Sequence, residues 1–500
     1  QLKATIPAAN LATAKTYPVT VFNPAPLGGI SSPVNFDVEN PVPIVNSISS
    51  TSIVRHVAND PDFSLTILGD NFLDSSVVLW SGAPIPTSYS GPKQVTGLIP
   101  NVNLLVAGTF DITVTNPAPG GGSDDAPTPF TVTNPPTATN LTQSVTTAKY
   151  GQAVDFTTSV SSSVFGSITG YVRVIVDGLE ADTVQLSGGS PSTAIWTTAG
   201  LNVGSHTVNV QYLGDTNYGP STYSPPAANP LSLTVEKADT ATTAVTASPP
   251  ATVYGQSVTF STLVSIVSPG GGSLNGNVVF KDGATVLATV AVSGPPPGAG
   301  ITVTTPGIAN LSAATHSITA EYQDSTGNYN NSPASSPLIF TVSKADVNIT
   351  SYTCGSASCS YSTYGEPLTL WAYVTVVAPG GNLLDGEWVD FYQGGTLLGS
   401  AQIGATYSGY SNWARLTNST AFRPGSLTIT ATFGASTPAH LASANYNVNN
   451  SNALTTVNKA YTTVATPSAS LASPAAYGQS VTFSATVNIT SPGGGLLNGT

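Results

Sequence analysis

Apolar and polar residues alternate over short stretches throughout this chain. Leu65 and Ile67 flank a polar residue, and Val77 and Leu79 follow some ten positions later. Alternation of this kind places every second side chain on one face, so both stretches are predicted to be strands with these residues turned inward. No stretch shows the 3.6-residue apolar period and the capping residues of a helix. The pattern therefore predicts a chain built of short strands.

One phrase of the sequence occurs twice and has the form of a β-hairpin. The copies begin at Thr16 and Thr109, and each contains Asn-Pro-Ala-Pro, then a run of glycines, then a second β-prone segment. Proline and glycine between β-prone segments are typical of turns. Each copy is therefore predicted to form a strand, a turn and a strand.

A second, longer repeat begins near residue 136 and carries Tyr-Gly-Gln or Tyr-Gly-Glu before a strand. This marker occurs as Tyr150-Gly151-Gln152, Tyr254-Gly255-Gln256, Tyr364-Gly365-Glu366 and Tyr477-Gly478-Gln479. Self-similarity at a fixed spacing is the sequence signature of a repeat architecture. The alternating segments after the last three markers are predicted to turn these residues inward: Val258, Phe260, Leu368, Leu370, Val481 and Phe483.

Other features of the second repeat also return. Asp177-Gly178 and Asp282-Gly283 stand between β-prone segments, a strong hairpin signal that the third copy lacks. A Ser-Pro-Gly-Gly-Gly run precedes the hairpin in the second and fourth copies, and complete copies end in Lys-Ala. We expect these boundaries to divide the chain into residues 1–40 (the C-terminal half of a unit of the first type), 41–135 (a complete unit of that type), 136–238, 239–345 and 346–460 (repeats 1 to 3 of the second type) and 461–500 (part of repeat 4).

The first type of unit resembles the IPT/TIG family, which has an immunoglobulin-like fold. The resemblance is carried by Gly69, Asn71 and Phe72, by Gly82, and by Asn116-Pro117 with the glycines that follow. It covers residues 41–135 in full and 1–40 in part.

The second type resembles the bacterial Ig-like repeats found in tandem on secreted and surface proteins. Its markers are the Tyr-Gly-Gln/Glu, Asp-Gly and Lys-Ala motifs, and it covers about residues 136–500. The two resemblances imply an all-β chain of tandem immunoglobulin-like β-sandwich domains in an extended array, located outside the cell or on its surface.

Both ends of the sequence fall inside a predicted sandwich. Half a sandwich leaves unpaired strand edges and an uncovered apolar face. We expect the sequence to be an excerpt of a longer chain. The alternative is that another subunit supplies the missing strands by strand addition.

Charge is sparse in this chain, which has 7% charged residues and a net charge of −12. The sign argues against nucleic acids and anionic membranes as partners. No apolar run reaches the length of a membrane span, so no membrane insertion is expected. Cys354 and Cys359 are predicted to form a small disulfide loop, since the other features indicate an extracellular protein.

No set of residues has the pattern of a catalytic, cofactor or metal site, and we expect none of the three. His206 and His316 occupy the same place in successive repeats, which indicates a structural role. No serine lies in a nucleophile elbow, and the glycine runs lack the lysine of a phosphate-binding loop. The acidic segments at residues 59–62 and 124–125 are more typical of solvated turns than of calcium loops.

Aromatic residues concentrate in residues 346–460 and form a candidate binding or assembly surface. Its members are Trp388, Tyr392, Tyr407, Tyr410 and Trp413. Aromatic rings are enriched at interfaces, but the alternation of Trp371 and Tyr373 also suits core packing.

These observations favour a non-enzymatic structural segment, a stalk or fibre, of a large modular protein, with self-association into a filament as a variant. A second hypothesis is an adhesin whose repeats bind a glycan or a surface protein. A third is an accessory region of a secreted hydrolase. Fold alone does not choose among them.

Overall fold

The computed structural model describes the chain apart from residues 125, 165, 224–229, 297–299, 356–358, 360, 382–383, 385, 405–410, 419–421 and 498–500. The described residues form strands and turns, with two 3-10 turns, η1 (Ala8–Leu11) and η2 (Asn101–Leu104), and no α-helix. Within this part of the chain no helix has the length and apolarity to cross a membrane. The predicted all-β fold is confirmed. The chain divides into two compact units, Gln1–Glu236 and Lys237–Thr500.

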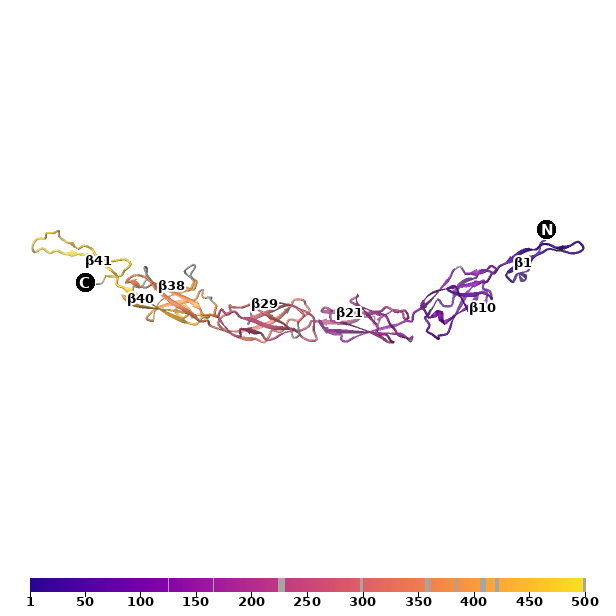
Figure 1. The fold of residues 1–500 in the computed structure, drawn as a ribbon, viewed down its shortest axis with the longest axis horizontal. Helices are drawn as coiled ribbons and strands as arrows, with labels where there is room; N and C mark the ends of the chain where they lie inside the picture. Colours follow the sequence, from indigo (N-terminus) through magenta and orange to yellow (C-terminus); the bar gives the residue numbers. More distant parts are fainter. Residues whose placement is uncertain are drawn as a thin grey trace. The chain divides into compact units, whose positions relative to one another are not determined.

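Residues 1–40 form two paired ribbons. β1 (Lys15–Val19) pairs antiparallel with β4 (Val34–Val38), and β2 (Phe22–Asn23) pairs with β3 (Gly29–Ile30). This confirms the predicted strand, turn and strand. None of these residues is buried, and Figure 1 shows the segment as the thin indigo end of the ribbon.

Residues 41–135 form a sandwich of two sheets. The first has the order β10 (Thr87–Gly91), β11 (Gln94–Ile99), β7 (Phe63–Asp70), β5 (Ile44–Ile48), and the second β6 (Ser52–Val54), β14 (Thr128–Thr133), β12 (Gly108–Asn116), β8 (Val77–Trp80), β9 (Ala83–Ile85), with β13 (Gly122–Ser123) on β12. Leu65 and Ile67 on β7 are fully buried, as predicted.

On β8 the predicted inward face is wrong by one residue. Val78 and Trp80 belong to the core, whereas Val77 and Leu79 are half-buried. Four consecutive apolar residues offer no alternation from which the buried face can be read.

Repeat 1 has a three-stranded and a larger sheet. The first has the order β15 (Ala138–Gln143), β17 (Val154–Ser161), β20 (Ser192–Thr198), and the second β16 (Thr147–Lys149), β23 (Leu231–Glu236), β21 (Gly204–Tyr212), β18 (Tyr171–Val176), β19 (Leu179–Gln185), with β22 (Ser221–Thr222) on β21.

Repeat 2 begins the second unit and has the same arrangement. In one sheet β24 (Thr240–Thr242), β25 (Thr246–Ser248) and β30 (Ile301–Thr304) pair with β27 (Thr259–Ile266); the other runs β26 (Thr252–Val253), β32 (Leu338–Ser343), β31 (Thr315–Asp324), β28 (Leu274–Asp282), β29 (Thr285–Gly294). Val258 and Phe260 are buried, as predicted.

Repeat 3 repeats this topology. Its sheets run β33 (Val347–Cys354), β35 (Leu368–Val376), β38 (Trp413–Asn418), and β34 (Tyr361–Thr363), β40 (Asn449–Asn458), β39 (Gly425–Phe433), β36 (Trp388–Gln393), β37 (Thr396–Gln402). Leu368 and Leu370 lie in the core, as predicted.

The Tyr-Gly-Gln/Glu marker is a turn that follows the short parallel strand in repeats 1 to 3. The glycine takes a positive φ, +80° at Gly255 and +82° at Gly365, which favours glycine over any other residue. The third marker residue then closes the turn with its side chain, because Gln256 Oε1 accepts a hydrogen bond from the Val253 N–H at 3.2 Å. The marker therefore recurs because the turn requires it.

The described part of residues 461–500 forms two further antiparallel strand pairs. β41 (Thr462–Val464) pairs with β44 (Val487–Ile489), and β42 (Ser468–Ala469) pairs with β43 (Phe483–Ser484). The prediction that Val481 and Phe483 turn into a core is wrong here: Val481 is half-buried and Phe483 is 72% exposed, because no second sheet covers these strands.

Candidate functional site

The predicted aromatic surface of repeat 3 is divided between the two sheets of the sandwich. Trp388 and Tyr392 lie on β36, in the five-stranded sheet, whereas Trp413 lies on β38, in the three-stranded sheet. Tyr407 and Tyr410 lie outside the described residues. Trp413, in contrast, has aromatic neighbours that were not part of the predicted surface.

Four aromatic side chains gather on the outer side of the three-stranded sheet, and we call them the aromatic face: Tyr352 on β33, Trp371 and Tyr373 on β35, and Trp413 on β38. Strand pairing brings them together, since Tyr352 lies opposite Trp371 and Tyr373 lies opposite Trp413.

Ring contacts link the aromatic face into one cluster. Trp413 meets Trp371 edge to face at a centroid distance of 5.9 Å, Tyr352 at 5.9 Å and Tyr373 at 4.8 Å. The Arg415 guanidinium lies 5.3 Å from the centroid of the Trp371 ring, which is cation–π range. Arg415 therefore places a positive charge at the edge of the cluster.

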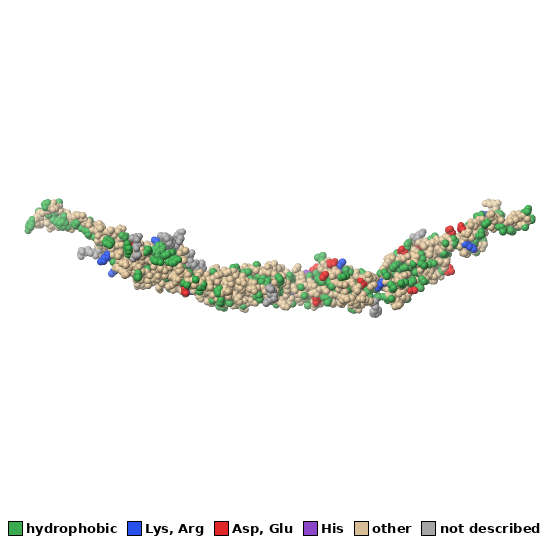
Figure 2. Space-filling view, in the orientation of Figure 1, with side chains coloured by type: hydrophobic (Ala, Val, Ile, Leu, Met, Phe, Trp, Pro, Cys, Tyr) green, Lys and Arg blue, Asp and Glu red, His purple; other side chains and the backbone are tan. Residues whose placement is uncertain are grey.

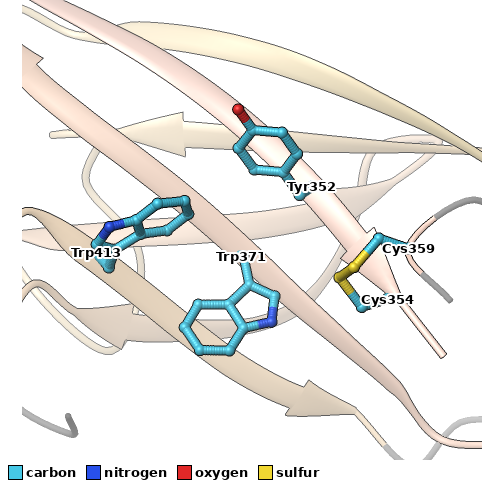
Figure 3. A pocket seen from close by; sticks show the side chains of 5 residues that line it. All are labelled: Tyr352, Cys354, Cys359, Trp371 and Trp413. Carbon is cyan, nitrogen blue, oxygen red and sulfur yellow. A yellow bond between two sulfur atoms is a disulfide. The ribbon is translucent and has the colours of Figure 1, made fainter. Parts of the chain in front are cut away.

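A cavity of about 350 Å³ opens beside these rings. It is lined by Tyr352, Trp371, Trp413 and the disulfide between Cys354 and Cys359 (Figure 3). The disulfide is the pairing predicted from the sequence. It ties the end of β33 to the segment that follows, so one wall of the cavity is covalently held.

Strand alternation turns the aromatic face away from the core. Leu370, Ala372 and Ala414 are fully buried and belong to the core of repeat 3. Trp371 and Trp413 are their neighbours along the strands, so they project from the opposite side of the sheet. The hypothesis that the alternation of Trp371 and Tyr373 reflects core packing is therefore wrong for these two side chains.

The other two complete repeats carry no such cluster at the matching positions. The Tyr-Gly marker and the strand register align Tyr352, Trp371, Tyr373 and Trp413 with Thr142, Thr157, Ser159 and Thr193 in repeat 1 and with Thr246, Ser261, Leu263 and Thr302 in repeat 2. Seven of these eight positions hold a threonine or a serine, the eighth is Leu263, and none is aromatic. The sandwich does not require aromatic residues on this face.

A second feature of the structure is the joint between repeats 2 and 3. The Gly381 N–H donates a hydrogen bond to the Tyr254 carbonyl oxygen at 3.1 Å, and the Tyr254 ring meets the Tyr446 ring edge-on at 5.2 Å. A Cβ atom on Gly255 would lie 2.4 Å from the Gly381 Cα atom. The two backbones therefore approach so closely that only glycine fits on either side.

The same joint recurs between repeats 3 and 4. The Gly494 N–H donates to the Tyr364 carbonyl oxygen at 3.0 Å. A Cβ atom on Gly365 would lie 2.2 Å from the Gly494 carbonyl carbon. The Tyr-Gly marker of one repeat and the glycine run of the next are thus the two halves of one contact.

The alanine of the Lys-Ala motif packs against the glycine run. A Cβ atom on Gly380 would lie 3.0 Å from the Ala345 Cβ, and one on Gly493 would lie 2.7 Å from the Ala460 Cβ. A side chain larger than alanine would displace the loop that meets the preceding repeat. The Lys-Ala motif marks the domain junction in the sequence, but its contact with the loop that meets the Tyr-Gly marker is not visible there, because marker and motif lie about a hundred residues apart within one repeat.

The repeated histidines brace the hairpin of their own sandwich. His206 Nδ1 lies 2.8 Å from Asp177 Oδ2, and its Nε2 lies 2.8 Å from the carbonyl oxygen four residues earlier. His316 makes the same two contacts with Asp282 and Ser312 at 2.7 and 2.8 Å. Both imidazole nitrogens are engaged, so the geometry is structural.

Repeat 3 holds a different Asp–His pair. Asp390 is fully buried, and its Oδ1 accepts a hydrogen bond from Ser400 Oγ at 2.5 Å and lies 2.8 Å from His440 Nε2. Trp388 stacks on the His440 ring at 4.9 Å with an interplanar angle of 6°. The carboxylate stands between the hydroxyl and the imidazole, so the order of a nucleophile, base and acid triad is absent. Trp388 serves to cover this pair.

Backbone N–H groups donate hydrogen bonds to the carboxylates of the first acidic segment. Asp60 Oδ2 accepts from the Val57 N–H at 2.8 Å, and Asp62 Oδ1 accepts from the Asn101 N–H at 2.7 Å. Asp125, of the second acidic segment, lies outside the described residues. In the part of the chain that the structure describes, no three His, Cys, Asp or Glu side chains group as metal ligands.

Residues 141–236 and 245–343 match the bacterial Ig-like domain (group 3). This agrees with the shared topology of repeats 1 and 2 and with the resemblance stated for their motifs. No curated protein matches the chain. The IPT/TIG resemblance of residues 41–135 stays a prediction.

Similar solved structures are tandem arrays of Ig-like domains. The tetra-tandem repeat from the extending region of a large adhesion protein is 12% identical, covers 81% of this chain and 98% of its own, and has a TM-score of 0.36. The calcium-stabilised ice-binding adhesin of an Antarctic bacterium is 14% identical, with coverages of 84% and 99% and a TM-score of 0.23. Domains A168–A170 of titin are 13% identical, with coverages of 59% and 98% and a TM-score of 0.21. These TM-scores are all below 0.5. The assignment of repeats 1 and 2 as bacterial Ig-like domains therefore rests on the family match and on the sheet order.

Proposed function

We propose that this chain is a non-enzymatic structural segment, a stalk or fibre, of a large extracellular or cell-surface protein. Its units are the tandem domains with the boundaries given above. The observation that supports this most is the joint, in which a Tyr-Gly turn of one repeat meets a Gly-Gly loop of the next at two successive positions. A chain whose repeated motifs connect its domains is suited to hold those domains in place and to transmit force between them.

Two further properties support an extracellular structural role. A disulfide such as Cys354–Cys359 persists in oxidising compartments. Figure 2 shows few acidic and basic side chains on the visible face, in line with the 7% charged residues. Sparse charge limits repulsion between neighbouring chains, which suits a protein present in many copies at a surface.

Electron microscopy of the purified chain without ligand tests the proposal. We expect separate chains of beads, one for each complete sandwich. Ordered filaments with a constant subunit repeat would instead favour the variant in which the chain self-assembles.

The aromatic face favours one further candidate function, that of an adhesin. Exposed rings on a sheet that does not need them are a reason to look for a ligand. Binding at this face adds to a structural role, because a stalk can carry a site along its length.

A further inference from the structure

We propose that the aromatic face of repeat 3 binds the pyranose rings of an extracellular polysaccharide. This inference goes beyond the structural role and does not depend on it. The aromatic face is defined by Tyr352, Trp371, Tyr373 and Trp413, with Arg415 and the Cys354–Cys359 disulfide at its border.

The sandwich fold does not explain the rings of the aromatic face. Repeats 1 and 2 build the same sheet with small, mostly hydroxyl-bearing residues at the matching outward positions, such as Thr157 and Ser261 opposite Thr142 and Thr246. The core of repeat 3 is complete without the aromatic face, since its buried residues lie on the inner side of the sheet. A cluster of four aromatic rings on the outer side of this sheet, without aromatic residues at the matching positions of repeats 1 and 2, indicates a ligand.

The shape of the site also suits a sugar. The Trp371 and Trp413 rings stand at 88° to each other, and the Tyr352 ring is tilted by 36° from that of Trp413. These rings border a cavity of about 350 Å³, within the size range of small-ligand sites. A pyranose presents an apolar C–H face that stacks on an aromatic ring, and its hydroxyl groups project around its edge.

Polar side chains stand around the aromatic rings. Thr350, Thr369 and Thr417 stand at outward positions of the same strands, and Arg415 adds one positive charge. No carboxylate occupies an outward position of β33, β35 or β38. Hydroxyl groups and a guanidinium around aromatic rings match the hydroxyl groups of a sugar.

The small area of the aromatic face favours a sugar over a protein partner. Tyr352 is 45% exposed and the other three rings are less exposed than that. At about 200 Å² for each ring when fully buried, the four present at most roughly 300 Å² to a ligand. A stable protein interface needs about 800 Å² from each partner. In Figure 2 the apolar side chains near β38 likewise form a compact group.

The test is the binding of the full chain to soluble polysaccharides, with hydroxyethyl cellulose as a neutral probe and polygalacturonate as a uronate probe. Affinity electrophoresis measures the association, and tryptophan fluorescence reports on the site. The double variant W371S/W413T installs the residue types that the sibling repeats hold, so the fold should accept it. L263T, at the position of Tyr373 in repeat 2, is the matched control.

We expect the wild type to be retarded by at least one of the two polysaccharides. The double variant should lose affinity by at least about tenfold, as for other aromatic anchors, and L263T should not. No binding by the wild type, or equal binding by the double variant, would overturn the proposal. So would a wild type that binds no sugar but forms dimers that the double variant abolishes. None of these results bears on the structural role, which microscopy tests separately.

Discussion

At the scale of single residues, the repeated motifs are explained by backbone conformation and by contact. The marker glycines combine a positive φ with a close approach to the next repeat, so Gly255 and Gly365 serve two purposes each. Gly283 has a positive φ of +56° but open space around it. These glycines therefore allow strain and contact to be separated.

Substitution of Gly255 by alanine should destabilise two sandwiches. The added Cβ forces Gly381 away, and positive φ alone costs about 1–2 kcal/mol. Calorimetry of the full chain should show lower transition temperatures for both repeat 2 and repeat 3. Gly283→Ala, which adds strain without contact, should affect repeat 2 alone, and the same pattern in both variants would count against the joint.

The His206–Asp177 pair should make repeat 1 depend on pH. Burial opposes the charged imidazolium, but the Asp177 carboxylate and a backbone carbonyl outweigh it and raise the pKa of His206 above its ordinary value. The Thr207 N–H and then His206 lower the pKa of Asp177. The contribution of His206 to the stability of repeat 1 is present below about pH 6.5 and is lost as pH rises through its raised pKa. The contribution of Asp177 is present above about pH 3.8 and is lost as pH falls through its lowered pKa.

His206→Gln should therefore cost most between about pH 4 and 6.5. Because Asp177 is half-exposed, we expect a loss of up to about 1 kcal/mol at pH 5.5 and less at pH 8.5. The transition temperature of repeat 1 in the wild type and in the variant at both pH values measures this. A deficit that is the same at both pH values would show that the pair carries no charge-dependent stability.

At the scale of elements, repeats 2 and 3 bury different residues at a matching position of the five-stranded sheet. Asp390 on β36 matches Val279 on β28 by strand register, since Val389 pairs with Phe433 as Val278 pairs with Tyr322. Repeat 2 thus buries an apolar residue where repeat 3 buries a carboxylate bonded to His440. The loop that carries His440 is held to β36 by this polar contact.

Substitution of His440 by leucine should be costly, because Asp390 would stay buried with its main partner removed. Breaking a buried pair from one side typically costs about 3–5 kcal/mol. The double variant D390V/H440L, which restores the valine of repeat 2, should recover most of the loss. Thermal unfolding of repeat 3 measures both, and no recovery in the double variant would contradict this account of the pair.

At the scale of the molecule, the sequence predicts the strands and the repeat types well because both depend on local pattern. Leu368 and Leu370 alternate cleanly and are buried, while the apolar run from Val77 to Trp80 hides its inward face. Contacts between distant residues were not predictable in this way. Tyr254 and Gly381 lie about 130 positions apart in the sequence, and nothing local at either residue indicates the other.

Part of the aromatic face could be predicted from the sequence. Once Leu368 and Leu370 are turned inward, alternation alone places Trp371 and Tyr373 outward. Tyr352 and Trp413 come from other strands, so their place beside Trp371 depends on sheet register. Trp388 and Tyr392 were grouped with Trp413 by proximity in sequence, although the structure places them on another sheet.

The central claim is that this chain is a series of separately folded sandwiches that bears load. Stretching single intact chains tests it most directly. We predict four separate unfolding events, for residues 41–135 and repeats 1 to 3, each lengthening the chain by roughly 30–40 nm. A smooth extension without separate events, or a single event for the whole chain, would contradict the account.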